Sequence, residues 1–154
     1  MFPALNLPQA SLRLTKSDKQ YLVWDEWRKK QVVLTPEEWV RQHLLHHLVQ
    51  DLDYPITRLA VEMQIEVNGL KRRCDAVVFD LQGKAQVLIE CKEPEVVLSA
   101  EVVQQIAQYN AKLNTQWLIL SNGMEHLTLR IEPQTGNFGV AHGLVHFSEI
   151  SSPV

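Results

Sequence analysis

The chain has 154 residues, of which 45% are hydrophobic and 21% are charged. This length and composition predict one globular domain, too small to hold a motor and a second catalytic module. The net charge of −3 excludes a protein that coats nucleic acid by electrostatic attraction alone. No apolar run reaches the roughly 20 residues of a membrane helix. We therefore expect a single cytoplasmic domain over residues 1–154, with Cys74 and Cys91 reduced.

The first third of the chain predicts an arm, one or two strands and a helix. Residues 1–19 contain two prolines and no periodic pattern, so they indicate an arm that packs on the body or is partly mobile. Residues 21–34 mix aromatic and β-branched residues, as short strands do. A helix is expected to begin after Thr35, with this residue as N-cap, Pro36 in the first turn and Glu38 completing a capping box.

Three strands then form a predicted antiparallel meander. Apolar and polar residues alternate over 61–67, and Asn68-Gly69 is typical of a two-residue hairpin turn. The second and third strands, 73–80 and 86–92, flank a turn at Gln82-Gly83.

The turn at Gln82-Gly83 decides how the second and third strands pair. If these are the two central residues of a tight hairpin, Asp80 pairs with Ala85, and the same register places Asp75 opposite Glu90. Directly opposed Cβ atoms lie roughly 4.5–5.5 Å apart. Two carboxylates at that distance repel each other, so we expect a cation or a shared proton between them.

A third carboxylate and an ammonium group belong to the same pattern. The Asn68-Gly69 turn places Glu62 opposite Asp75, and Lys92 ends the third strand. Carboxylates together with the Cys91 backbone carbonyl suit Mg²⁺, while a lysine can orient water or stabilise charge on a phosphate. The alternative is a solvated face on which these acids pair with neighbouring arginines and lysines. A register slip of one residue would also move a strand's side chains to the other face.

The rest of the chain predicts a helix followed by strands. Ser99 is the expected N-cap of a helix through Lys112, residues 117–120 are typical of a buried strand, and 127–131 and 138–147 are expected to add strands. A helix that joins two strands of one sheet permits parallel pairing. The fold class is therefore α/β, with a mixed sheet flanked by helices.

Asp75 followed by Glu90-Cys91-Lys92 resembles the D…ExK signature of the PD-(D/E)xK nuclease superfamily. Further segments resemble the nuclease domain at the N-terminus of type I restriction enzyme R subunits, in the order 34–42, 71–75, 89–94, 105–110 and 121–123. This resemblance implies a restriction-endonuclease-like αβββαβ core over 20–132, preceded by the arm 1–19 and followed by a C-terminal strand and tail over 133–154.

The resemblance also implies Mg²⁺-dependent hydrolysis of DNA, with Mn²⁺ as a substitute and Asp75, Glu90 and Lys92 as the catalytic trio. Such families often add an acid from the first helix. Glu37 and Glu38 are both candidates, and Glu37 is favoured because it lies nearer the apolar face. The expected metal ligands are Asp75, Glu90, the Cys91 carbonyl and Glu62. The expected nucleic-acid contacts are Gln105 and Tyr109 of a QxxxY motif together with Arg28, Lys29, Lys30, Arg72 and Arg73.

The sequence contains no P-loop, so no ATP-driven motor is expected. The candidate partners are DNA, other subunits of a restriction or DNA-processing system, and a second copy of the chain. One alternative function is a catalytically inactive nucleic-acid-binding module, and another is a protein-interaction subunit on a nuclease fold. For the QxxxY motif, the alternative is that Tyr109 packs in the core while Gln105 covers its polar edge.

Overall fold

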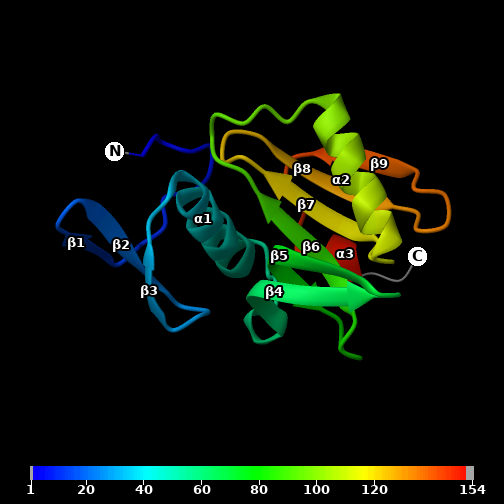
Figure 1. Cartoon of the computed structure of the whole chain (residues 1–154), viewed down its shortest axis with the longest axis horizontal. Coiled ribbons are helices and arrows are strands. Elements are labelled where there is room, and N and C mark those ends of the chain that lie inside the picture. The colour runs from blue at the N-terminus through cyan, green and yellow to red at the C-terminus, as the bar shows by residue number, and fades with distance from the viewer. Residues whose placement is uncertain (1, 152–154) are drawn as a thin grey trace.

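The computed structural model describes residues 2–151 and contains two β-sheets (Figure 1). The small antiparallel sheet consists of β1 (Leu14–Ser17), β2 (Gln20–Asp25) and β3 (Lys30–Val33). The large sheet has the order β4 (Leu59–Val67), β5 (Leu70–Phe79), β6 (Ala85–Cys91), β7 (Trp117–Ser121), β8 (His126–Ile131) and β9 (Phe138–His142). The helices are α1 (Pro36–Asp51), the 3₁₀ turn η1 (Ile56–Arg58), α2 (Ala100–Lys112) and α3 (Phe147–Ser151).

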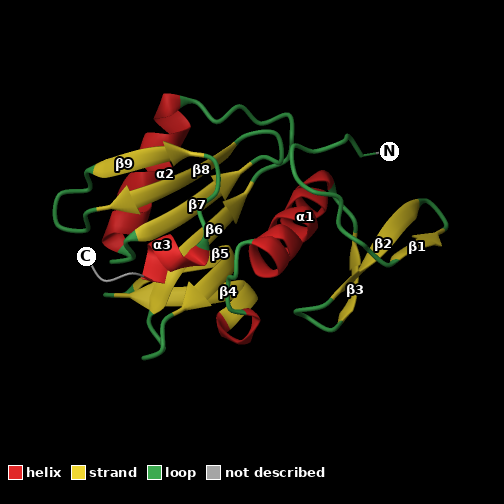
Figure 2. Cartoon of the chain, turned by 180° about the vertical axis from the view of Figure 1, so that it is seen from behind, coloured by secondary structure: helices red, strands yellow, loops and turns green. Residues whose placement is uncertain are grey.

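Helices cover both faces of the large sheet. Figure 2, the view from behind, shows α1 and α3 on the face opposite to α2. Two apolar clusters follow this division. The α1 cluster includes Leu44, Leu48, Ala76, Ile89 and Phe147, and the α2 cluster includes Cys74, Val77, Leu88, Val103 and Ala107.

The predicted α/β class with a mixed sheet is confirmed. The order α1-β4-β5-β6-α2-β7 is the expected αβββαβ order, and β6 and β7 pair in parallel across the α2 crossover. The other pairs of neighbouring strands in this sheet are antiparallel. In the described part of the chain, no helix has the length and apolar character needed to cross a membrane.

The start of α1 is as predicted in one respect and different in another. The Thr35 hydroxyl accepts a hydrogen bond from the Glu38 amide at 3.1 Å, which confirms the N-cap. The reciprocal bond of a capping box is absent among the described residues, because the Thr35 amide donates to the Val33 carbonyl. The Glu38 carboxylate instead binds the guanidinium groups of Arg28 and Arg41. Two buried arginines compete better for this carboxylate than one amide does.

The Asn68-Gly69 turn is a two-residue hairpin, as predicted. Val67 pairs with Leu70, and both turn residues have positive φ, +51° at Asn68 and +80° at Gly69. These values are typical of a type I′ turn.

The predicted pairing beside Gln82-Gly83 is wrong. Asp80 does not pair with Ala85, because Phe79 does, and the Asp80 amide donates to the Lys84 carbonyl. The Asp80 carboxylate accepts bonds from the Gln82 and Lys84 amides at 2.9 Å, which closes a longer turn.

A register shift beside Phe79 absorbs the extra residue of this turn, so that Val78 pairs with Val87 and Ala76 with Ile89. The predicted register therefore holds at the end of the hairpin that carries Asp75.

The chain ends also differ from prediction. Residues 14–17 form β1 and are not part of an arm, and residues 138–147 form a strand only as far as His142, before α3. The segment before β1 packs on the body: the Trp39 indole donates to the Pro3 carbonyl at 2.9 Å, and the Asn6 amide donates to the Gly123 carbonyl at 2.8 Å.

Candidate active site

Asp75 lies at an irregular point of β5. Side chains two residues apart on a strand normally face the same side. Here Cys74 belongs to the α2 cluster and Ala76 to the α1 cluster, so the alternation changes at Asp75. On β4, Glu62 lies between the residues paired with Cys74 and Ala76, and its φ of +55° is left-handed. This irregularity frees the Asp75 side chain from either apolar face.

The Asp75 carboxylate reaches β6 and α1. Its Oδ2 accepts a hydrogen bond from the Cys91 amide at 2.8 Å, and its Oδ1 accepts one from Arg41 at 3.2 Å. In a strand, the N–H and C=O of one residue point to the same neighbouring strand. The Cys91 carbonyl therefore faces the side on which Asp75 lies, as a metal ligand at this position would need to do.

Glu37, in the first turn of α1, shares this position with Asp75. Partial burial of its carboxyl group, the negative charge of Asp75 and a hydrogen bond with it raise the pKa of Glu37 to about 7. The positive charges of Arg41 and Lys92 act in the opposite direction. Glu37 as a whole residue is solvent-exposed, although its carboxyl group is partly buried. The neighbouring Asp75 carboxylate is a further cause of the raised pKa that an ordinary surface acid lacks. The structure thus brings Glu37, and not Glu38, beside Asp75.

Glu90 is the residue of β6 that follows the Ala76–Ile89 pair, but its side chain is held towards α2. It is 9% exposed and forms an ion pair with Arg72. Arg72 also donates to Asn110 at 2.5 Å, and its guanidinium lies 4.9 Å from the centre of the Tyr109 ring. Burial raises the pKa of Glu90, and the positive charge of Arg72 opposes that rise.

Lys92 and Glu62 flank this group. Lys92 follows β6, and its amide donates to the Ser121 carbonyl of β7 at 2.8 Å. Its positive charge lowers the pKa of Glu37 and of Glu90, and its ammonium makes none of the ion pairs found among the described residues. The Glu62 carboxylate is bound by Arg41 and by Arg73.

The residues predicted to contact nucleic acid fall into two groups. Arg28 and Arg72 are committed to ion pairs inside the protein, with side chains 18% and 13% exposed. Lys29, Lys30, Arg73 and Gln105 are exposed. Gln105, Tyr109, Arg72 and Ile106 line an open hollow of about 350 Å³, in which the Tyr109 hydroxyl donates to the Lys71 carbonyl at 3.2 Å. This hollow adjoins Glu90 through Arg72.

The charges of this region are unbalanced. Six carboxylates meet four guanidinium groups and the ammonium of Lys92, which leaves one negative charge when all are ionised. The carboxylates are Asp25, Glu37, Glu38, Glu62, Asp75 and Glu90, and the arginines are Arg28, Arg41, Arg72 and Arg73. A divalent cation would compensate this excess.

The donors fit Mg²⁺ in number and kind. Mg²⁺ is usually held by one or two carboxylates and several waters. The Glu37–Asp75 pair and the Cys91 carbonyl provide such donors. Within residues 2–151, no three His, Cys, Asp or Glu side chains are already grouped to hold an ion. Glu90 lies between Ile89 and Cys91 of the α1 cluster, so its side chain points to the α2 side of β6, where it pairs with Arg72.

Asp25, Arg41 and Asn110 belong to this region and were not predicted, and the last two had signals that could have been found. Arg41 contacts three acids, and Asn110 binds Arg72. Each had a signal in the sequence. Arg41 follows Glu37 and Glu38 by four and three residues on one helix, the spacing of helical ion pairs. Asn110 continues the apolar stripe of Val103 and Ala107, where a polar side chain needs a buried partner.

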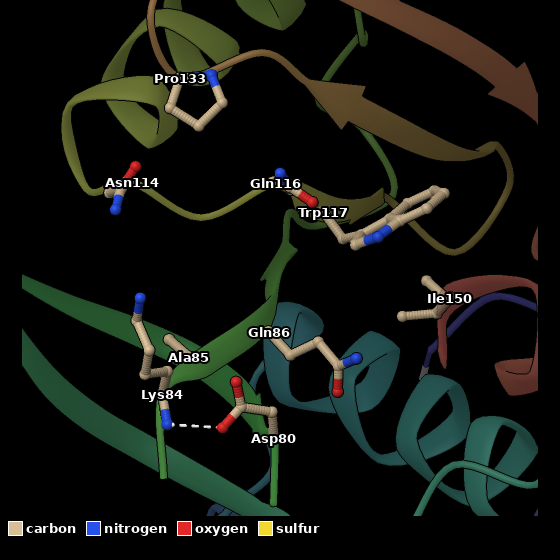
Figure 3. A pocket seen from close by; sticks show the side chains of 9 residues that line it. All are labelled: Asp80, Lys84, Ala85, Gln86, Asn114, Gln116, Trp117, Pro133 and Ile150. Carbon is tan, nitrogen blue, oxygen red and sulfur yellow. Dashed lines mark hydrogen bonds between the residues drawn. The ribbon is translucent and has the colours of Figure 1, made fainter. Parts of the chain in front are cut away.

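A separate pocket lies at the other end of the β5–β6 hairpin. It has a volume of about 310 Å³, and Lys84, Gln86, Asn114, Gln116 and Trp117 are among its lining residues (Figure 3). Asp75 and Cys91 lie at the opposite end of the same strands. The candidate site is therefore not in this pocket.

The sequence was compared with known protein families. The family model of the type I restriction enzyme R protein N terminus matches residues 36–144, from the start of α1 to beyond β9. No curated protein matches the chain. The matched region contains all the acids of the site except Asp25. More than half of the chain is covered, and the protein therefore belongs to the family of type I restriction enzyme R protein N-terminal domains.

Proposed function

We propose that the protein is a Mg²⁺-dependent nuclease of the PD-(D/E)xK type that hydrolyses DNA phosphodiester bonds. The observation that carries this proposal is the contact of the Glu37 and Asp75 carboxyl groups beside the Cys91 peptide, with Lys92 close by. Acids from two distant segments meet there in an arrangement that costs energy without a cation or a proton. Membership of a restriction enzyme family supports DNA as the substrate.

Each residue has a distinct role in this proposal. Asp75, Glu37 and the Cys91 carbonyl would hold the ion, which supplies an activated water and neutralises charge on the phosphate. Glu90 joins them if it exchanges Arg72 for the ion. Lys92 would orient the attacking water and stabilise the charge that develops on phosphorus. Glu62 and Glu38 remain paired with arginines and hold the surrounding side chains.

The exposed cations around the site would contact the DNA backbone. Lys29, Lys30 and Arg73 are solvent-exposed, and Gln105 and Tyr109 line the adjoining hollow. Affinity of this kind is sequence-independent, so specificity would come from other restriction subunits or from a second copy of the chain.

Titration of Mn²⁺ and Mg²⁺ by calorimetry, with cleavage assays on supercoiled and linear DNA, tests this function. We expect saturable Mn²⁺ binding that is lost in Asp75→Ala, and cleavage that is lost in both Asp75→Ala and Lys92→Ala. Lys16→Ala serves as a matched control, because this exposed lysine of β1 lies outside both the metal site and the proposed DNA contacts. Cleavage by both site variants at the parental rate would reject the assigned residues.

A second candidate function is non-catalytic nucleic-acid binding. It is favoured by one observation, that Arg41 and Arg72 already neutralise Asp75 and Glu90. A parent protein that shifts DNA in a gel but binds neither metal ion would support this alternative.

A further inference from the structure

We propose that Arg41 is a positioning residue that holds the Asp75 carboxylate in place for the metal ion, an inference that rests on the proposed nuclease function. Its side chain is 7% exposed and projects from α1 towards β4 and β5. Nη1 binds Asp75 and Glu62, while Nε and Nη2 bind Glu38. The planar guanidinium thus uses both of its sides to connect the helix to the two strands.

The backbone of β5 does not by itself direct the Asp75 side chain. The alternation of β5 changes at this residue, and the facing Glu62 adopts a left-handed conformation. The paired register omits Glu62 and Asp75, although their neighbours on both sides are paired. The side chain is therefore positioned by its contacts, which are the hydrogen bonds from Arg41 to Oδ1 and from the Cys91 amide to Oδ2, and the contact with the Glu37 carboxyl group.

Arg41 is itself anchored from behind. Glu38 is 4% exposed and binds both Arg41 and Arg28, the latter at 2.6 Å. Arg28 in turn binds Asp25, whose carboxylate also accepts bonds from the amides of Trp27 and Arg28 at 2.8 Å. A row of alternating charges thus runs from the turn after β2, through α1, to Asp75. Because every charged group of this row is bonded to its neighbour, the Arg41 side chain has few alternative conformations.

Hydrogen exchange of the Cys91 amide reports the position of Asp75 directly. Cys91 ends β6, and its amide donates to the Asp75 carboxylate. We expect Arg41→Lys to accelerate exchange at this amide about tenfold, because the single nitrogen of a lysine cannot replace the three guanidinium nitrogens that reach Glu38, Glu62 and Asp75. We also expect the same variant to weaken Mn²⁺ binding about tenfold, the usual effect of losing a group that orients a ligand.

Arg28→Lys is the matched control. This arginine is also buried and also binds Glu38, but it does not contact Asp75. It should lower the unfolding temperature but change Cys91 exchange and Mn²⁺ affinity much less than Arg41→Lys does, because it reaches Asp75 only through Glu38 and Arg41. Equal effects of the two variants on Cys91 exchange would overturn the proposal, as would an Arg41→Lys protein with parental exchange and affinity.

Asp75→Asn provides an independent variant. It keeps an oxygen for the Cys91 amide but removes the charge that Arg41 binds. Cys91 exchange should accelerate in Asp75→Asn, and adding Arg41→Lys should change it no further. If Arg41→Lys alone does not fold, parental exchange in Asp75→Asn would overturn the proposal. Exchange requires neither metal nor DNA, so a parent protein that binds no Mn²⁺ rejects the nuclease function separately.

Discussion

The carboxyl group of Glu37 lies beside that of Asp75, although one residue is in the first turn of α1 and the other lies within β5. Without a cation, Glu37 keeps its proton at pH values where ordinary acids have lost theirs, because its pKa is raised to about 7. The contact has consequences for stability as well as for metal binding.

The metal-free protein should become less stable as the pH rises through 7. The pKa of Glu37 is raised from 4.5 to about 7, so its stabilising contribution is complete below pH 4.5 and is lost as the pH passes 7. Allowing for solvent screening of this exposed residue, the loss is about 1 kcal/mol. Glu37→Gln should flatten the dependence of the unfolding temperature on pH between 5 and about 8 in chelator. It should also weaken Mn²⁺ binding. An unchanged pH dependence would show that the two carboxyl groups do not interact.

Arg72 should compete with a metal ion for Glu90. The two side chains form a largely buried ion pair, and no other described cation forms an ion pair with this carboxylate. Arg72→Gln should therefore strengthen Mn²⁺ binding several-fold at pH 8, although it lowers the unfolding temperature. The matched control is Arg73→Gln, which removes an exposed arginine that binds Glu62 instead. Calorimetric titration of Mn²⁺ into the two variants compares their affinities. Weaker Mn²⁺ binding in Arg72→Gln than in the parent would show that Arg72 does not compete with the metal ion for Glu90.

Asp25 should protect the fold against acid. Burial acts against its charged form, but hydrogen bonds from the backbone and side chain of Arg28 outweigh burial and lower its pKa below the ordinary 3.8. The stabilisation is therefore present above pH 3.8 and is lost as the pH falls through the lower folded value.

Asp25→Asn should cost about 3 kcal/mol in urea unfolding at pH 7, because it leaves a buried arginine with one acid fewer. The cost should shrink at low pH. Asp51→Asn, on an exposed acid that pairs with His47, should cost less than about 0.5 kcal/mol. A similar cost for both variants would refute the role of the buried pair.

Gly123 should be required for docking of the N-terminal segment. Its φ is +86°, and an added Cβ would lie 2.7 Å from Leu5 Cδ2 and 3.0 Å from Val40 Cγ2. Gly123→Ala should cost about 1 kcal/mol for the backbone and about 1 kcal/mol more for the contact, because the end of the Leu5 side chain must move and Val40 must give way slightly. Gly83→Ala has nearly the same φ of +84° with nothing within 4 Å, so it isolates the backbone cost. Equal costs for the two variants would mean that the segment does not pack there.

Elements whose signals are local were predictable from the sequence. Thr35-Pro36 starts α1, Asn68-Gly69 makes a two-residue turn and Ser99 caps α2, because each depends on backbone groups within a few residues. The same patterns predicted the α/β class and the αβββαβ order. They failed at the turn after β5, where Asp80 does not pair with Ala85. There the Asp80 side chain accepts hydrogen bonds from the Gln82 and Lys84 amides and closes a longer turn.

Which arginine pairs with which carboxylate of the site depends on the tertiary structure and could not be predicted from the sequence. The register brought Asp75 and Glu90 to neighbouring positions on two strands, but the ion pair that each carboxylate forms depends on arginines supplied by other elements. Arg41 arrives from α1, and Arg72 is held by Asn110 of α2. Long side chains that cross between layers follow no sequence period, since their partners are set by the packing of helices on the sheet. The sequence therefore predicts which acids gather here, and the packing of α1 and α2 determines which of them face one another.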